Sequence, residues 1–309
     1  MGRMSTTHEA GSPMTAGPTD PHTGARTGTY MALGSMLTVQ LGIAAAVGLF
    51  DEVGPLGAAW LRLAWAGLIM LVILRPRPST FTKGSFAASV ALGIVTAGIT
   101  ILFMEAVERL PMGTASALEF LGPLGVAVLR SHGRGRLFAA VAAAGVLLLT
   151  EPWRGETDLV GVGFALAAAA CWAAYILLTQ RVGDQVAGVQ GLGVSMPVAG
   201  LVATAVAGPS VAPLLTWEVV LAGLGLAILL PVIPFTLELL ALRRLTAGAF
   251  GTLMALEPAF AVLIGLVALG QVPGALPLVG IACVVVAGIG AERTGARHRA
   301  PAEAAEAGA

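Results

Sequence analysis

Ten apolar segments, most of them about 20 residues long, follow one another along this chain of 309 residues. About 20 apolar residues are needed for a helix to cross the hydrocarbon core of a membrane. Hydrophobic residues make up 57% of the chain and charged residues 11%, against about 25% charged residues in soluble domains. The sequence therefore predicts an all-α polytopic membrane protein with ten transmembrane helices. These are expected at Tyr30–Phe50, Pro55–Leu74, Phe86–Ala106, Met112–Leu129, Leu137–Leu149, Leu159–Leu178, Val189–Val206, Val219–Leu240, Gly248–Leu269 and Leu276–Ala291.

The distribution of basic residues predicts the orientation of these spans. If the amino terminus is cytoplasmic, 14 of the 17 Lys and Arg residues fall in cytoplasmic segments, and only Arg109 and Arg154 fall in outer loops. Cytoplasmic loops of membrane proteins carry such an excess of basic residues. We therefore expect both termini in the cytoplasm. Residues 1–29 and 292–309, which lack an apolar period, are expected to be disordered cytoplasmic tails.

Composition excludes several classes of function. The net charge is zero, so no broad basic surface for nucleic acid is expected. The two cysteines, Cys171 and Cys283, lie in apolar segments, and all four histidines lie in tails or a loop, which gives no metal-ligand spacing. Neither a His-Glu-x-x-His nor a Gly-x-Ser-x-Gly motif occurs. We expect no cofactor, no metal site and no enzyme activity.

The two halves of the chain resemble each other. A shift of 135 residues aligns 103–125 with 238–260 and gives seven identities in 23 positions. They pair Ala106 with Ala241, Arg109 with Arg244, Leu110 with Leu245, Gly113 with Gly248, Leu118 with Leu253, Leu121 with Leu256 and Pro123 with Pro258. Since each half holds five spans, the second half enters the membrane inverted. The sequence predicts two inverted five-helix repeats, 30–150 and 159–291, an arrangement typical of secondary transporters.

Charged residues inside spans are candidates for function. Arg62, Glu119 and Glu257 are the most central, whereas Glu105 lies near an outer end and Glu238 near an inner end. A charge at a helix centre costs roughly 2.5–3.5 kcal/mol on insertion scales, so such groups face a cavity or a partner. One reading is an ion-pair network that holds helices together. The other is binding of substrate or protons.

A zwitterionic substrate fits this set of charges. Its carboxylate would meet the planar guanidinium of Arg62, and its ammonium group would meet Glu119 or Glu257. Gln40, Trp172 and Tyr175 are further candidates for lining the cavity or, alternatively, for packing between helices.

Proton coupling is a second role for the buried acids. An apolar cavity disfavours a bare negative charge, so Glu119, Glu257 and Glu238 are candidates for taking up protons during transport. The alternative for Glu238 is a local pairing with Arg243 or Arg244.

Prolines inside spans mark candidate hinges. Pro123 and Pro258 hold equivalent places in the two halves, and Pro231 and Pro234 interrupt the eighth span. Proline frees a backbone carbonyl and kinks a helix. The alternative is that these prolines serve packing only.

Several stretches make the chain resemble the drug/metabolite transporter superfamily, in its EamA-type branch. They are Leu61-Arg62-Leu63-Ala64, Ala117-Leu118-Glu119-Phe120 with Gly122-Pro123, Ala170-Cys171-Trp172-Ala173-Ala174-Tyr175-Ile176-Leu177 with Gln180-Arg181, Leu237-Glu238, Phe250-Gly251-Thr252-Leu253-Met254 and Glu257-Pro258-Ala259. The resemblance implies a ten-helix exporter of the bacterial cytoplasmic membrane with a central cavity between two halves. It also implies that Arg62, Glu119, Glu238 and Glu257 are functional. The family often has Gly-Glu after the ninth helix, where this chain has Gly270-Gln271.

The leading hypothesis is secondary active export of small amino acids of the threonine and homoserine kind, by proton antiport. The alternative is efflux of other small metabolites or drugs, and an integral membrane enzyme is the alternative from a different class. The expected partners are the substrate, protons and the lipid bilayer, with a homodimer as an open option.

Overall fold

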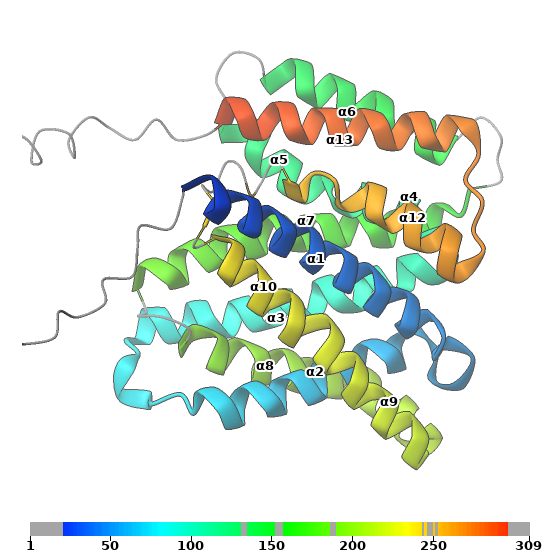
Figure 1. Cartoon of the computed structure of the whole chain (residues 1–309). Helices are drawn as coiled ribbons and strands as arrows, with labels where there is room; N and C mark the ends of the chain where they lie inside the picture. Colours follow the sequence, from blue (N-terminus) through cyan, green and yellow to red (C-terminus); the bar gives the residue numbers. More distant parts are fainter. Residues whose placement is uncertain are drawn as a thin grey trace, which may run out of the picture.

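The computed structural model describes a chain whose regular structure, in the described residues, is helical throughout (Figure 1). The described residues are 21–130, 135–151, 157–185, 190–242, 244–245, 250 and 253–295. The α-helices are α1 (Pro21–Val47), α2 (Phe50–Leu74), α3 (Lys83–Arg109), α4 (Met112–Glu119), α5 (Leu121–Arg130), α6 (Gly135–Thr150), α7 (Leu159–Gln185), α8 (Gln190–Val211), α9 (Trp217–Ala227), α10 (Ile233–Leu242), α12 (Glu257–Leu269) and α13 (Ala275–Gly295). Short 3₁₀ turns occupy Pro78–Thr80 and Ala212–Leu214.

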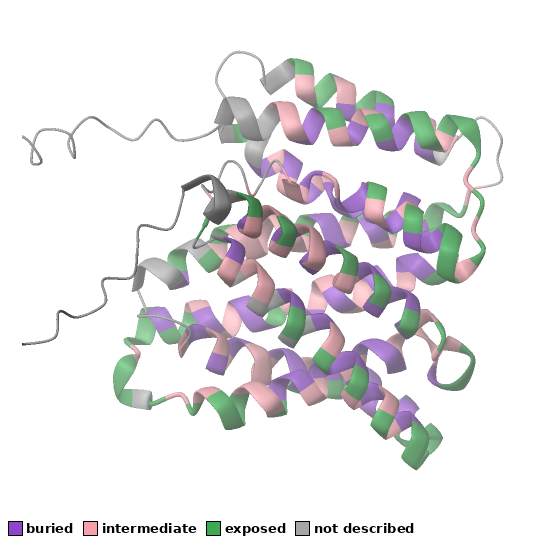
Figure 2. Cartoon of the chain, viewed as in Figure 1, coloured by how far each residue is buried: buried purple, intermediate pink, exposed green. Residues whose placement is uncertain are grey.

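Length and hydropathy identify a polytopic membrane protein. Five helices are long and apolar enough to cross a membrane: Arg26–Val47, Phe50–Leu74, Lys83–Arg109, Leu159–Thr179 and Gln190–Leu214. Four shorter apolar helices accompany them, at Leu137–Leu149, Trp217–Leu230, Glu257–Leu269 and Ala275–Gly290. Large apolar residues are exposed, with Ile73 63% and Val267 73% exposed, and exposed positions recur along the helices of the bundle (Figure 2). An apolar outer surface is what lipid contact requires.

Three of the expected spans are interrupted rather than continuous. The fourth divides at Phe120 into α4 and α5, and the ninth has a turn at Ala255 and Leu256 before α12 begins. Pro123 and Pro258 each follow their interruption by two or three residues. Proline lacks an N–H group and its ring clashes with the carbonyl four residues earlier, which explains both breaks. In the eighth span a π-helix, Ile228–Val232, joins α9 to α10.

The first helix begins earlier than the sequence predicts. Residues 21–29, expected to belong to a disordered tail, form the first turns of α1, which begins at Pro21. Proline is favoured at the first helical position, and the buried Gly28 lies against Arg244 and Leu245. At the other end α13 continues to Gly295, four residues beyond the expected span. The rest of both expected tails, 1–20 and 296–309, lies outside the described residues.

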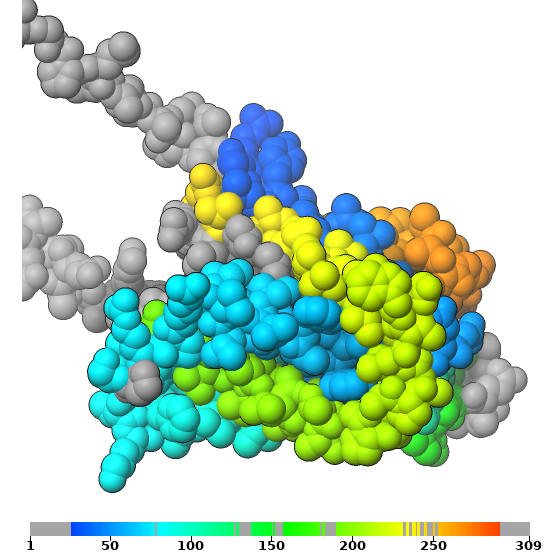
Figure 3. Space-filling model, turned by 90° about the horizontal axis from the view of Figure 1, so that it is seen from below, coloured from blue at the N-terminus to red at the C-terminus, as the bar shows by residue number. Residues whose placement is uncertain are grey.

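The helices lie roughly side by side, with their connections at two opposite ends of the bundle (Figure 1). We call the end with Asp51, Glu108, Glu151 and Glu218 the acidic end, and the opposite end, with Arg75, Arg77, Lys83, Arg181 and Arg244, the basic end. Helix α3 packs against α7 and α8, α2 against α8 and α9, and α6 against α13. Helix α1 packs against α10 and α12, and its contact with α10 is visible in Figure 3.

Facing glycines allow α6 and α13 to approach closely. A Cβ atom added to Gly145 would lie 2.8 Å from the Gly280 carbonyl oxygen, and one added to Gly280 would lie 2.7 Å from the Gly145 carbonyl oxygen. These distances are shorter than a carbon–oxygen contact allows, and backbone cannot move aside as a flexible side chain can. Small residues at helix interfaces of membrane proteins permit such approach.

Substitution of Gly280 by alanine is therefore expected to destabilise the protein by about 1–3 kcal/mol, the usual cost of overpacking. The measurement is the midpoint of thermal unfolding of the purified protein in detergent. Gly163→Ala is the matched control, because no atom lies within 4 Å of its added Cβ. Alanine is favoured over glycine in a helix by about 0.5–1 kcal/mol, so the control should be neutral or stabilised. Equal midpoints for the two variants would contradict the close contact.

Candidate functional site

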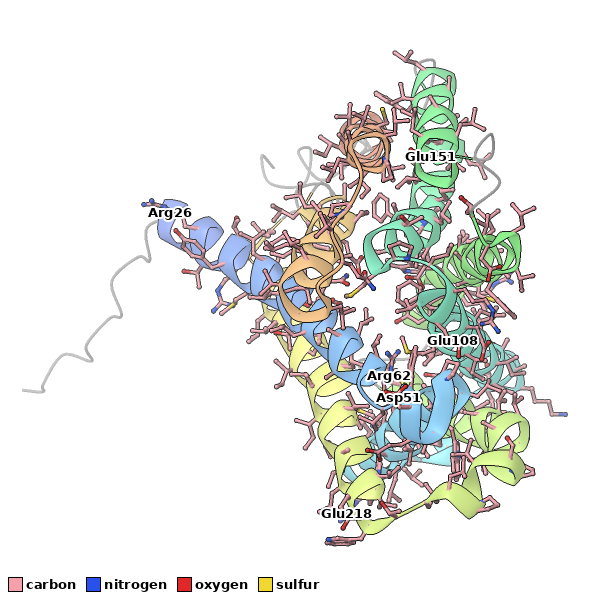
Figure 4. The ribbon with its side chains drawn as sticks, turned by 90° about the vertical axis from the view of Figure 1, so that its right-hand side faces the viewer. Arg26, Asp51, Arg62, Glu108, Glu151 and Glu218 are labelled. Carbon is pink, nitrogen blue, oxygen red and sulfur yellow. The ribbon has the colours of Figure 1, made fainter. Side chains whose placement is uncertain are left out.

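Arg62 carries a positive charge into the interior of the bundle. It lies in the middle of α2, and in the view along the helices it appears among them, whereas Arg26 and Glu218 lie at the periphery (Figure 4). Its Nη2 donates a hydrogen bond of 3.0 Å to Oγ1 of Thr100 in α3, which is buried. Within the described part of the chain, no carboxylate oxygen lies within 4.0 Å of the guanidinium. Arg62 is thus held by a neutral hydroxyl group, and its charge stays available to an anion.

Two buried acids flank the interrupted helices. Glu119 is the last residue of α4 and Glu257 the first of α12, and they are 7% and 8% exposed. Helices α4 and α12 pack against each other. Glu119 lies within electrostatic range of both Arg62 and Glu257. The structure therefore brings together Arg62, Glu119 and Glu257, which the sequence singled out as the central charges.

Gln40 joins this group from α1. Its Nε2 donates to Oε1 of Glu257 over 3.4 Å. The remaining oxygens of the two side chains, Gln40 Oε1 and Glu257 Oε2, are buried and have no hydrogen-bond donor among the described residues. Buried polar atoms are almost always hydrogen-bonded, and leaving one unpaired costs about 1–3 kcal/mol. These two neighbouring acceptors therefore offer a place for a ligand that donates hydrogen bonds.

Glu238 extends the row of acids toward the basic end. It lies in α10, within electrostatic range of Glu257 and of Tyr175 in α7. The hydroxyl group of Ser35 in α1 is 2.9 Å from Glu238 Oε1 and 3.2 Å from the carbonyl oxygen of Pro234. Within the described chain, Arg244 forms no ion pair with Glu238 and donates instead to the Leu240 carbonyl oxygen. Arg243, the other expected partner of Glu238, lies outside the described residues.

The two aromatic candidates occupy different places along α7. Trp172 packs edge-on against Phe120, the residue after Glu119, with ring centroids 6.3 Å apart. Tyr175, one turn further along α7, lies near Thr179 and within electrostatic range of Glu238. Trp172 is therefore adjacent to the central acids, whereas Tyr175 belongs to the surroundings of Glu238.

One charged residue of the spans has a structural partner. Glu105 forms an ion pair of 2.7 Å with Arg109 near the acidic end, and Arg109 also pairs with Glu108 at 2.9 Å. The Arg109 guanidinium lies over the ring of Phe164, 5.1 Å from its centroid. The charged groups of this cluster pair with one another, and Arg62 is not part of it.

Gln271, which stands where the family often has a glutamate, forms a hydrogen bond between two helices. Its Oε1 accepts a hydrogen bond of 2.8 Å from the backbone N–H of Met112, the first residue of α4. Gly270 ends α12 in the left-handed conformation, with φ of 65°, which turns Gln271 toward α4. A neutral amide oxygen here satisfies a free N–H group at a helix start, so this contact between α12 and α4 needs no acid.

Comparison with known proteins identifies the family of the chain. The EamA-like transporter family matches residues 159–290. The chain is 34% identical over 264 residues to the threonine/homoserine exporter RhtA of Escherichia coli (strain K12), covering 84% of this chain and 89% of the relative. It is 32% identical, with the same coverage, to RhtA of Salmonella typhimurium (strain LT2). A crystal structure at 16% identity has the same fold, with a TM-score of 0.57 over 86% of this chain and 96% of that one.

These matches confirm the resemblance drawn from the sequence, and they confirm a transporter rather than an enzyme. Identity above 30% over more than four fifths of the chain places both halves, and not only the matched 159–290, within one family. The protein is a multi-pass membrane protein that belongs to the EamA-like transporter family.

Proposed function

We propose that the protein is a secondary active exporter of small amino acids of the threonine and homoserine kind. The observation that carries the proposal is a pair of buried oxygens, of Gln40 and Glu257, that have no hydrogen-bond donor among the described residues. Glu119 lies within electrostatic range of both Glu257 and Arg62, and Arg62 donates to the hydroxyl group of Thr100. An ammonium group has three N–H donors to offer these acceptors. A carboxylate forms a bidentate pair with a guanidinium. A small amino acid carries both groups, and the relatives of this chain are named as threonine/homoserine exporters.

Proton antiport is the proposed source of energy. Glu119, Glu257 and Glu238 form a row of acids in which each lies within electrostatic range of the next. Ionised carboxylates in such a row repel one another, so binding a proton or an ammonium ion relieves the repulsion. Proton and substrate would then compete for the same acids, which is the requirement for exchange.

The proposed transport path runs between two inverted five-helix repeats, 30–150 and 159–291. The contacts of two glycines support the repeat. Gly28 at the start of α1 lies against Arg244 and Leu245, and Gly161 at the start of α7 lies against Arg109 and Leu110. Arg109-Leu110 and Arg244-Leu245 correspond under the shift of 135 residues that relates the two halves, whereas the two glycines lie 133 residues apart, near the starts of their helices. We further propose that Pro123 and Pro258 act as hinges where their helices are interrupted.

The proposed location is the bacterial cytoplasmic membrane, with both termini in the cytoplasm. The basic end then faces the cytoplasm and the acidic end faces outward, as the positive-inside rule requires. Interfacial aromatic residues give further support, since Trp217 at the acidic end is 70% exposed.

Transport in proteoliposomes tests the proposal. Purified protein is reconstituted, a pH gradient is imposed, and uptake of labelled threonine, homoserine and a panel of other small metabolites is followed. We expect accumulation of threonine and homoserine that disappears when an ionophore collapses the gradient. Liposomes without protein are the control. If folded protein moves neither amino acid but moves another compound of the panel, the amino-acid assignment is wrong and the alternative of metabolite or drug efflux holds.

A further inference from the structure

A separate cavity lies beside Glu238, toward the basic end of the bundle. Its volume is about 120 Å³. It is partly open and is lined by residues of α1, α2, α8, the π-helix and α10, namely Val39, Met70, Leu192, Met196, Leu230, Pro234 and Glu238. Arg62 and its partner Thr100 are not among the residues that line it.

The wall of this cavity is apolar apart from one carboxylate. Valine, leucine and proline side chains and the thioethers of Met70 and Met196 surround Glu238. The volume is several times the roughly 10–15 Å³ that a single water needs by the same kind of measure. There is space for a small organic molecule with an aliphatic body, and methionine side chains adapt readily to such bodies.

Ser35 fixes the carboxylate at the edge of the cavity. Its hydroxyl group contacts Oε1, and no hydrogen bond to Oε2 is found within the described chain. The titratable groups within electrostatic range of Glu238 there are Tyr175 and Glu257, neither of which is cationic. Among the described residues, the carboxylate therefore has one oxygen without a hydrogen bond and no basic partner.

The chemistry of the wall selects one class of ligand. An anion would be repelled by Glu238, and a neutral apolar molecule would leave the carboxylate unpaired, which is costly. Metal cations such as Ca²⁺ need six to eight oxygen ligands, and the described residues contain no group of three His, Cys, Asp or Glu side chains that could hold one. An ammonium ion on a short aliphatic chain pairs with the carboxylate and fills the apolar space.

We propose that the cavity beside Glu238 is a binding site for primary alkylammonium ions, distinct from the site at Arg62. It requires no carboxylate on the ligand. The proposal goes beyond amino-acid export, because the ligand needs neither a carboxylate nor a contact with Arg62, although the site shares Glu238 with the proposed row of proton-binding acids.

Calorimetric titration of the protein in lipid nanodiscs with n-butylammonium chloride tests the site. We expect saturable binding, with butyrate and 1-butanol giving none at the same concentrations. Glu238→Gln preserves the size of the side chain and removes the charge, and it should weaken binding about tenfold or more, the range for hydrogen bonds to charged groups. Glu105→Gln, whose carboxylate pairs with Arg109 near the acidic end, should bind the amine within about threefold of the wild type. Absence of saturable binding to the wild type would overturn the proposal.

Ser35 supplies a second pair of variants in case Glu238→Gln does not fold. Ser35→Ala loses the hydrogen bond to Oε1, and Ser35→Thr keeps a hydroxyl group, so we expect weaker amine binding in the first and near wild-type binding in the second. The proposal would be contradicted if the wild type, Glu238→Gln and Ser35→Ala bound the amine with equal affinity. It would also be contradicted if the wild type bound 1-butanol as tightly as the amine. These results stand whether or not the protein transports threonine, so failure of this site is distinguishable from failure of the proposed export.

Discussion

Proteoliposomes containing the Arg62→Ala variant are expected to lose gradient-driven accumulation of threonine by at least about tenfold. The guanidinium would provide the only cationic contact for the substrate carboxylate at the proposed site, and hydrogen bonds to charged groups contribute about 1.5–3 kcal/mol each. The substitution also leaves Thr100 without its partner and Glu119 without the nearby positive charge. Initial rates over a range of threonine concentrations measure the effect.

Arg62→Lys distinguishes recognition from simple charge balance. Lysine keeps the positive charge but cannot form the planar, bidentate pair that arginine makes with a carboxylate. If Arg62 binds substrate, the lysine variant should show a raised KM for threonine and partial transport. If the arginine only neutralises Glu119, the lysine variant should transport as the wild type does, and the assignment of Arg62 to the substrate carboxylate would be wrong.

The second large effect is expected at Glu257. Glu257→Gln keeps the acceptor for Gln40 Nε2 but removes a charge from the row of acids. We expect the variant to lose accumulation driven by the pH gradient, because the group that exchanges protons for substrate is gone. Any residual movement of threonine down its own gradient should no longer respond to pH.

Glu105→Gln is the matched control for this experiment. Glu105 also lies in an expected span, but it pairs with Arg109 near the acidic end, away from the row of acids. Gradient-driven transport by this variant should stay close to the wild type. If the Glu257→Gln variant folds normally and still couples threonine transport to the pH gradient as the wild type does, Glu257 is not in the proton path. Glu119 and Glu238 then remain the candidates.

Much of the fold follows from the sequence because the membrane imposes a length on every apolar helix. The interruptions do not follow from hydropathy, since apolar residues continue on both sides of each break apart from the single acids Glu119 and Glu257. Pro123 and Pro258 are the local signal that predicts a break in the helix. The early start of α1 was missed because residues 21–29 lack apolar character, and their helical form depends on packing of Gly28 against distant residues.

The site was predictable in its charged members and not in its hydroxyl groups. Arg62, Glu119 and Glu257 stand out because charges are rare in spans. Thr100 and Ser35 do not stand out, since serine and threonine in helices commonly bond the carbonyl four residues earlier, as Thr38, Thr96 and Thr204 do here. Only the spatial pairing distinguishes Thr100, bound to Arg62, from Thr96 on the same helix.

The glycine contact between α6 and α13 has a consequence for measuring motion. Where Gly145 and Gly280 meet, the two backbones approach each other directly and neighbouring side chains such as Leu149 and Val284 pack around them, so the two helices are constrained to move together. A pair of spin labels, one on the lipid-facing side of each helix, should therefore report a constant separation in every state of the protein. The distance between these two labels is then a fixed reference, with which distances between labels on α1, α10 and the interrupted helices can be compared.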